Sequence, residues 1–181
     1  MASKHQDAPG ELETVRAFVN SVDMEGGTEE FRDPEALAGW LAGYGLLEPG
    51  THATTADLRR AVDVREALRA LMRANTDGEP AGEARATLRA AAARAKLALE
   101  FAPEGSQLAP RADGVDGALG RLLVRVHDAQ HDGTWARMKA CPWHTCHWAF
   151  YDHTKNRSGV WCNMAVCGNR AKAKAYRERH A

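Results

Sequence analysis

Four cysteines near one end of the chain constrain its fold more than any other feature. Cys141 and Cys146 form one pair, Cys162 and Cys167 form a second pair, and 15 residues separate the two pairs. Structural zinc sites commonly take two ligands from each of two tight turns. Clustered cysteine pairs in a chain without a secretory signal indicate a metal site more than disulfides. The spacing therefore predicts one structural Zn²⁺ held by all four thiolates, with redox-active thiols as the alternative.

Three histidines near these cysteines leave the ligand set open. His144 lies inside the first pair, His147 follows Cys146 directly, and His153 comes six residues after His147. Each of them could replace a thiolate, but the set of four cysteines needs no such substitution. A metal with four protein ligands has no open position for water, so we expect this site not to be catalytic.

The charge of the chain is balanced overall but divided unevenly. The formal net charge is zero, whereas residues 134–181 contain nine Lys or Arg residues and two acidic residues, a balance of +7. The remaining 133 residues therefore carry −7. A basic segment can bind a polyanion while an acidic remainder keeps the protein soluble. Nucleic acid is thus the first candidate partner, and a basic solubilising tail is the alternative.

The residues before the cysteines predict a mainly helical domain. Asp33-Pro34 is a favourable helix start, and Thr54 with Asp57 resembles a capping box. A strand with Leu97, Leu99 and Phe101 in alternation is expected to return across Glu104-Gly105 as a short hairpin. Apolar residues recur at helical spacing in residues 11–22, 55–74 and 115–130, and the alanine-rich residues 83–95 are expected to form a further helix.

A row of arginines marks the longest of these predicted helices. Arg65, Arg69 and Arg73 recur every four residues on a face other than the apolar one. Such a row could bind an anion. We interpret it instead as a solvated face that the nearby Asp63 and Glu66 partly neutralise.

The cysteine-containing segment predicts a small zinc finger. Residues 135–140 and 147–151 are expected to form paired strands, residues 152–159 a turn, and Val160-Trp161 a return to the second cysteine pair. A helix is expected from about Met164, with Cys167 in its first turn, where the helix dipole favours a thiolate. The fold class is therefore mainly α (α+β): a helical domain with a short β-hairpin at residues 1–133, then a treble-clef-like zinc finger at residues 134–181.

The last helix is the main candidate for contact with DNA phosphates. Arg170, Lys174 and Arg177 share one face, and the small residues Ala171 and Ala175 share another that could pack on the finger. A basic helix held rigid by zinc suits phosphate contact. The full set of candidate nucleic-acid contacts is Arg137, Lys139, Lys155, Arg157, Arg170, Lys172, Lys174, Arg177 and Arg179.

Other functional classes have less support in the sequence. There is no nucleophile elbow, P-loop, HExxH motif or dinucleotide fingerprint, so we do not expect an enzyme. No apolar run is long enough to span a membrane, and no apolar stretch follows the first residues as a secretory signal would require. We therefore expect a cytoplasmic protein without membrane partners. A protein-interaction module or scaffold, in which zinc only staples a small tail, is the alternative function.

Two motifs resemble a known family. Cys167-Gly168-Asn169-Arg170, together with Phe150-Tyr151-Asp152, resembles the CGNR zinc finger. Phe18-Val19-Asn20-Ser21 resembles the opening motif of the ABATE domain, which commonly precedes that finger in bacterial proteins. The resemblance implies a bacterial stress-induced transcription regulator whose four cysteines bind the metal, whose finger binds DNA and whose ABATE domain senses a small-molecule effector.

Two further expectations concern partners. Asn20, a polar residue beside Phe18 and Val19, could point into an effector pocket, or it could cap the first helix or form a buried hydrogen bond. Regulators often pair to read two half-sites, so a homodimer is a second partner to consider. No coiled-coil seam marks an interface for such a dimer.

Overall fold

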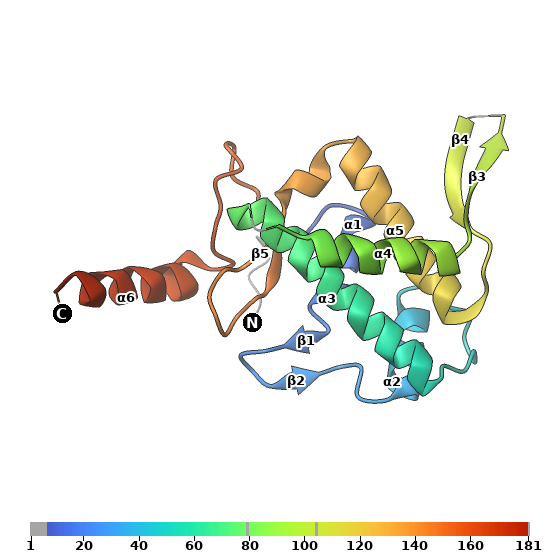
Figure 1. Ribbon diagram of the computed structural model, residues 1–181, viewed down its shortest axis with the longest axis horizontal. Coiled ribbons are helices and arrows are strands. Elements are labelled where there is room, and N and C mark those ends of the chain that lie inside the picture. The colour runs from blue at the N-terminus through green and yellow to red at the C-terminus, as the bar shows by residue number, and fades with distance from the viewer. Residues whose placement is uncertain (1–6, 79, 104, 181) are drawn as a thin grey trace.

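A computed structural model of the chain describes residues 7–78, 80–103 and 105–180. Helices dominate, and the strands in this part of the chain pair only as three separate antiparallel ladders (Figure 1). In chain order the elements are α1 (Leu12–Val19), β1 (Val22–Asp23), β2 (Thr28–Glu29), α2 (Pro34–Gly43), α3 (Thr55–Asp77), α4 (Gly82–Arg94), β3 (Leu97–Ala102), β4 (Gly105–Pro110), α5 (Gly114–His131), a 3-10 turn (Thr134–Arg137), β5 (Met138–Ala140), β6 (Ala149–Tyr151), a π-helical turn (Met164–Gly168) and α6 (Asn169–His180).

The helix starts predicted from capping residues are confirmed. The Asp33 carboxylate accepts a hydrogen bond from the Ala36 backbone N–H at 2.8 Å, with Pro34 in the first turn of α2. Thr54 and Asp57 form a reciprocal capping box at the start of α3. Each cap satisfies backbone donors that a helix start otherwise leaves without a partner.

Helix α3 is the centre of the fold. It contacts α1, α2, α4, α5 and β5, and it crosses the middle of the molecule in Figure 1. Leu68 and Met72 on its apolar face are fully buried, as are Phe18 of α1 and Leu122 of α5. The apolar stripes predicted for these helices therefore meet in one core.

The predicted β-hairpin is confirmed as β3 and β4. Leu97 pairs with Pro110 and Leu99 with Leu108, and the hairpin extends away from the helices at one end of the molecule (Figure 1). Glu104, in the predicted turn, lies outside the described residues. The base of the hairpin packs against α5 at Gly120, where a Cβ atom would lie only 2.8 Å from the Pro110 Cβ.

The hydrophobic core continues past residue 133 into the cysteine-containing segment. Trp135, Met138, Ala140 and Ala149 are buried in the same cluster as the apolar faces of α1, α3 and α5. Strand β5 packs along α3, and β6 contacts α1. The two parts predicted on either side of residue 133 thus share one core.

Three local expectations differ from the structure. Residues 134–137 form a 3-10 turn, so strand β5 is shorter than the predicted residues 135–140. Val160 and Trp161 adopt no regular structure and form no returning strand. Helix α6 contains no buried residue and extends away from the body of the molecule (Figure 1), so Ala171 and Ala175 do not pack on the finger as expected.

The structure also bears on the membrane prediction. Across the described residues, no helix combines the length and the apolar character that crossing a bilayer requires.

Candidate metal centre

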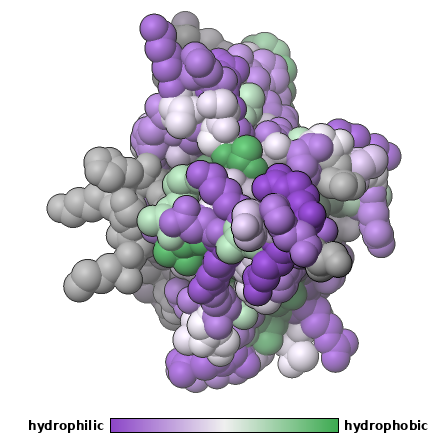
Figure 2. Space-filling view, turned by 90° about the vertical axis from the view of Figure 1, so that its left-hand side faces the viewer, coloured by the Kyte–Doolittle hydropathy of each residue, from purple (hydrophilic) through white to green (hydrophobic). Residues whose placement is uncertain are grey.

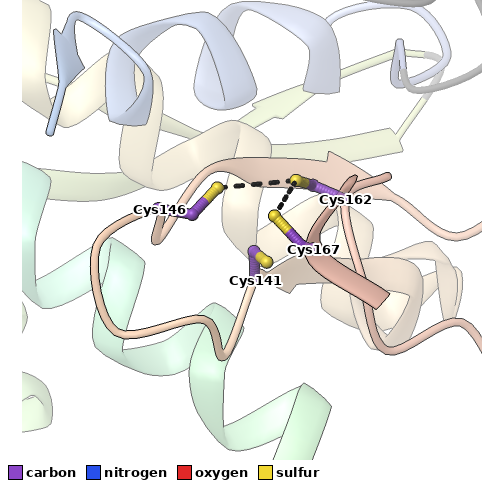
Figure 3. Close-up of side chains that lie close together, drawn as sticks. All are labelled: Cys141, Cys146, Cys162 and Cys167. Atoms are coloured by element: carbon purple, nitrogen blue, oxygen red, sulfur yellow. Dashed lines mark hydrogen bonds between the residues drawn. The ribbon is translucent and has the colours of Figure 1, made fainter. Parts of the chain in front are cut away.

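The four cysteine side chains converge at one point (Figure 3). Their sulfur atoms all lie within 4.8 Å of one another, with 3.5 Å between Cys146 and Cys162 and 3.8 Å between Cys162 and Cys167. All four thiols are free, and these separations are well beyond the ~2.05 Å of a disulfide. Cys141, Cys146 and Cys167 are buried, and Cys162 is half-buried.

This arrangement fits a tetrahedral zinc ion. Four ligands at the usual Zn–S distance of ~2.3 Å place neighbouring sulfurs ~3.8 Å apart. The sulfur separations of 3.5 and 3.8 Å match that value closely. Thiolate ligands in a closed set of four are typical of structural zinc, which stabilises the fold and leaves no position open for a reacting water.

The thiols also show why a cation is needed. Hydrogen bonds from Cys146 and Cys162 lower the pKa of the Cys141 thiol to about 2. Hydrogen bonding to Cys141 raises the pKa of Cys146 to about 12 and also raises the pKa of Cys162. Burial raises the pKa of Cys167. Four thiolate charges this close repel one another strongly, so a bound cation is what allows all four cysteines to be deprotonated together.

The histidines lie outside this group of ligands. The metal-binding group that the structure brings together contains the four cysteines and neither His144 nor His147. His144 is exposed, and the His147 ring makes a hydrogen bond through Nε2 with the His144 carbonyl oxygen at 3.1 Å. His153 contacts the Asp7 carbonyl oxygen at 2.9 Å. The all-cysteine set is thus the one that the geometry supports.

The second cysteine pair is shaped by the residues around Cys167. Asn163 caps the π-helical turn, because its side-chain oxygen accepts hydrogen bonds from the Ala165 and Val166 backbone N–H groups at 2.9 and 3.2 Å. Asn169 donates to the Ala165 carbonyl at 3.1 Å. Cys167 therefore lies in a short turn that continues directly into α6 and fixes where that helix begins.

The arginine row of α3 is not a solvated face, so that interpretation is wrong. Arg65 and Arg69 are only 4% and 5% exposed. Arg65 forms a two-point ion pair with Glu29 at 2.7 and 2.8 Å. Glu66 pairs with both arginines at 2.9 Å, as the sequence suggested. This charged face is therefore covered by other parts of the chain, and its burial is tolerated because the guanidinium groups have ion-pair and hydrogen-bond partners there.

Lys139 is not available to DNA. It is buried, and its ammonium group donates to Asp152 at 2.8 Å and to the carbonyl oxygens of Arg157 and Gly159 at 2.6 and 2.7 Å. Although burial would raise the pKa of Asp152, hydrogen bonds led by that from Lys139 lower it to about 2. We therefore remove Lys139 from the candidate DNA contacts.

The other basic candidates lie nearer the surface. Arg137 is half-buried and donates to the carbonyl oxygens of Asp152 and Thr154, both at 2.8 Å. Arg170 pairs with Glu25 in the turn between β1 and β2. Figure 2, which views the molecule from the end where α6 protrudes, shows mostly hydrophilic residues on this face. The exposed basic residues of this segment are Lys155, Arg157, Arg170, Lys172, Lys174, Arg177 and Arg179.

Asn20 does not point into an effector pocket, so that expectation is corrected. Its side chain is buried and forms two hydrogen bonds with the backbone of Ala149, donating to the carbonyl at 2.9 Å and accepting from the N–H at 2.8 Å. Asn20 thereby joins the end of α1 to β6 of the metal segment. The alternative of a buried hydrogen bond is the correct one.

Several residues that contact the metal segment were not predicted from the sequence. Asn75 and Thr76, in the last turn of α3, donate to backbone carbonyls of residues 135–140. Their only sequence signal is a pair of polar residues at the end of a helix, where such residues are common. Glu25 likewise has a neighbour, Arg170, that no local pattern indicates. The cap formed by Asn163 is local, because asparagine is a favoured residue at helix starts, and it could have been predicted.

Comparison with known families agrees with the motifs. A family model named ABATE, described as "Putative stress-induced transcription regulator", matches residues 13–142. A model of the CGNR zinc finger matches residues 137–180. The two matches overlap where β5 packs on α3, and together they confirm both resemblances. No curated protein matches the chain.

Proposed function

The chain belongs to the ABATE family, described as "Putative stress-induced transcription regulator", and carries a CGNR zinc finger, and we propose that it is a bacterial regulator that binds DNA through this finger. The observation that carries the proposal is α6, a helix rich in basic residues that begins next to a metal ligand and has no buried residue. The proposal includes three further points: the protein acts in the cytoplasm, its closed metal site is structural, and it has no catalytic role.

Helix α6 has little reason to protrude unless something binds it. An isolated helix of about 12 residues is marginal in water, because most helices gain their stability from packing an apolar face. Here the chain fixes only the start of the helix, through the turn that contains Cys167. Phosphates along a DNA groove would supply the missing interactions for its basic side chains.

Removing charge from α6 tests the proposal. The triple variant Arg170→Gln, Lys174→Gln and Arg177→Gln is expected to weaken duplex DNA binding on the order of tenfold or more at ~0.1 M salt. It should also make the slope of log affinity against log salt shallower by roughly 2 to 3, because up to three phosphate contacts are lost. Fluorescence anisotropy with a mixed genomic duplex pool measures both quantities.

A matched control separates local contact from total charge. Arg59, Arg85 and Arg89 are exposed on α3 and α4, and replacing all three with glutamine removes the same charge outside the finger. This control should bind DNA nearly as tightly as the parent protein. Failure of the zinc-loaded parent to retard any of the pool at low salt would contradict DNA binding altogether.

A protein-interaction module is the second candidate, and one observation favours it. Val160, Met164 and Val166 are 38%, 49% and 40% exposed around the second cysteine pair. Apolar side chains gathered on a small surface often mark a protein contact. Such a partner would remain bound at high salt, where DNA contacts weaken, so pull-downs at low and high salt distinguish the two functions.

We place the proposed effector site in a cleft between the start of α1, strand β4 and helix α5. The cleft has a volume of about 560 Å³, and Leu12, Leu108 and Val124 contribute to its lining. Arg125 also lines it, pairs with Glu11, and has a buried Nη1 for which the described residues provide no hydrogen-bond partner. Clefts with an apolar lining and a few polar groups are the usual sites for small ligands.

Ligand screening tests this assignment. A small molecule that raises the melting temperature of the parent protein should lose most of that effect in Arg125→Ala. The same molecule should keep its effect in Arg59→Ala, because Arg59 is exposed elsewhere on α3. An equal shift in all three proteins would place the effector outside this cleft.

A further inference from the structure

The end of α3 holds the first strand of the metal segment by its backbone. The Asn75 side-chain amide donates to the carbonyl oxygens of Trp135 and Met138, each at 2.9 Å. The Thr76 hydroxyl lies 3.0 Å from the Ala140 carbonyl oxygen and 3.1 Å from that of Met72 in its own helix. Ala140 directly precedes the ligand Cys141, so these contacts fix the chain where it enters the metal site.

Two arginines of the same helix contact the backbone at the two ends of the first cysteine pair. Arg69 donates through Nη1 to the His147 carbonyl at 2.8 Å and through Nη2 to the Val19 carbonyl at 2.6 Å. Arg73 donates through Nη1 to the Cys141 carbonyl at 3.4 Å. His147 follows the ligand Cys146 and has a positive φ of 50°, so this hydrogen bond supports an uncommon backbone conformation.

These arginines also suit the charge of the loaded site. Four thiolates and one Zn²⁺ carry a net charge of −2, which is costly to bury without compensation. The guanidinium groups of Arg69 and Arg73 lie beside the backbone that carries Cys141 and Cys146, and Arg69 is itself buried. Arg69 also pairs with Glu66 and Arg73 with Asp77, so each guanidinium group lies between a carboxylate of α3 and the backbone of the metal segment.

We propose that Arg69, Arg73, Asn75 and Thr76 are positioning residues of the metal site, and that metal binding and the packing of α3 form one coupled equilibrium. The contacts that hold the metal segment come from the helical domain, so the finger does not bind metal as an independent unit. Coupling of this kind is reciprocal: whatever stabilises α3 tightens metal binding, and metal binding stabilises α3. This inference does not depend on DNA binding.

Zinc affinity in two α3 variants tests the coupling. Both variants are made in the full chain. Asn75→Ala should weaken zinc binding roughly 10- to 100-fold, and Thr76→Val should weaken it by up to about 10-fold. Residues that orient metal ligands typically have effects of this size. Competition with a chromophoric chelator gives the dissociation constants. Thr87→Val is the matched control, because the Thr87 hydroxyl bonds within α4, to the Glu83 carbonyl at 3.3 Å, and among the described residues it has no bond to the metal segment.

Hydrogen exchange on the parent protein gives a second, independent measurement. Removing zinc with a chelator should speed amide exchange in residues 66–77 of α3 at least several-fold, whereas α2 should change little. This comparison needs no variant, so it decides the matter if Asn75→Ala fails to fold. Unchanged zinc affinity in the folded variants, or unchanged exchange in α3 on zinc removal, would overturn the proposal while leaving DNA binding open.

Discussion

Replacing Cys162 with serine is expected to abolish tight zinc binding and to release α6 from its fixed start. Cys162 lies between two other ligands, with its sulfur 3.5 Å from that of Cys146 and 3.8 Å from that of Cys167. Structural zinc contributes roughly 10–16 kcal/mol of apparent binding free energy at neutral pH, and a serine hydroxyl is a poor replacement for a thiolate. The variant should therefore contain little zinc after purification.

The zinc content of the variant and the NMR signals of α6 test this prediction together. Elemental analysis should fall from one zinc per chain in the parent protein to well under half of that in Cys162→Ser. NMR signals of α6 should shift toward those of a disordered segment, because the turn that carries Cys167 is no longer held. DNA binding should weaken with them if α6 is the contact helix.

Histidine variants provide the control for the ligand set. His144 and His147 lie next to the first cysteine pair but outside the group of converging ligands. His144→Ala, with an exposed side chain, should keep stoichiometric zinc and parent-like affinity. If His144→Ala loses zinc and Cys162→Ser keeps it, the four-cysteine set is wrong.

The convergence of the four cysteines could be predicted from the sequence because much of it depends on local spacing. Two tight turns bring Cys141 to Cys146 and Cys162 to Cys167, and only the meeting of the two pairs requires the fold. The helix starts at Asp33 and Thr54 were predictable for the same reason, since a cap is satisfied by residues within one turn. Features set by neighbours in sequence could thus be derived without the structure.

The arginine row was misjudged because periodicity identifies a face but not what covers it. Arg65 and Arg69 recur at helical spacing, as residues on a solvated face also do. In the structure, Glu29 and the Val19 carbonyl come from distant segments to satisfy them. Burial of a charged side chain depends on partners far along the chain, which no window of sequence reveals.

Helix α6 illustrates the opposite error. Its small residues Ala171 and Ala175 suggested a packed face, yet Ala175 is exposed and Ala171 only half-buried. Alanine favours a helix whether or not anything packs on it. The sequence therefore indicates that the segment is helical, while its partner remains a separate question that the DNA experiment addresses.

Asp152→Asn is expected to destabilise the protein by about 3–5 kcal/mol, the usual cost of leaving one member of a buried ion pair uncompensated. The side chains of Lys139 and Asp152 are 5% and 1% exposed. Asparagine keeps the shape of the carboxylate but removes its charge, so the Lys139 ammonium loses its counter-ion. Urea denaturation with zinc in excess, followed by tryptophan fluorescence, measures the change in unfolding free energy.

The loop after β6 explains why this carboxylate is held so firmly. Asp152 accepts hydrogen bonds from the Thr154 N–H and hydroxyl at 2.9 and 2.7 Å and from the Gly159 N–H at 2.8 Å. A side chain at position 159 would collide with it, since a Cβ atom there would lie 2.7 Å from Asp152 Oδ1. Residues 152–159 are thus folded around one buried charge.

The pH dependence follows from the sign of the shift in the pKa of Asp152. Its pKa falls from an ordinary 3.8 to about 2 in the folded protein, so its stabilising effect is complete above about pH 4 and declines as pH falls toward 2. The difference in stability between the parent and Asp152→Asn should therefore be constant at neutral pH and shrink in that acid range. Loss of zinc in acid affects both proteins, and comparing them removes that common contribution.

A double variant separates the ion pair from general damage to the loop. Replacing Lys139 with methionine together with Asp152→Asn removes both charges, and buried ion pairs replaced by neutral residues often cost little. The double variant should accordingly be more stable than Asp152→Asn alone, even though it also loses the lysine's bonds to the Arg157 and Gly159 carbonyls. A double variant less stable than either single one would show that hydrogen bonding, and not charge compensation, dominates at this site.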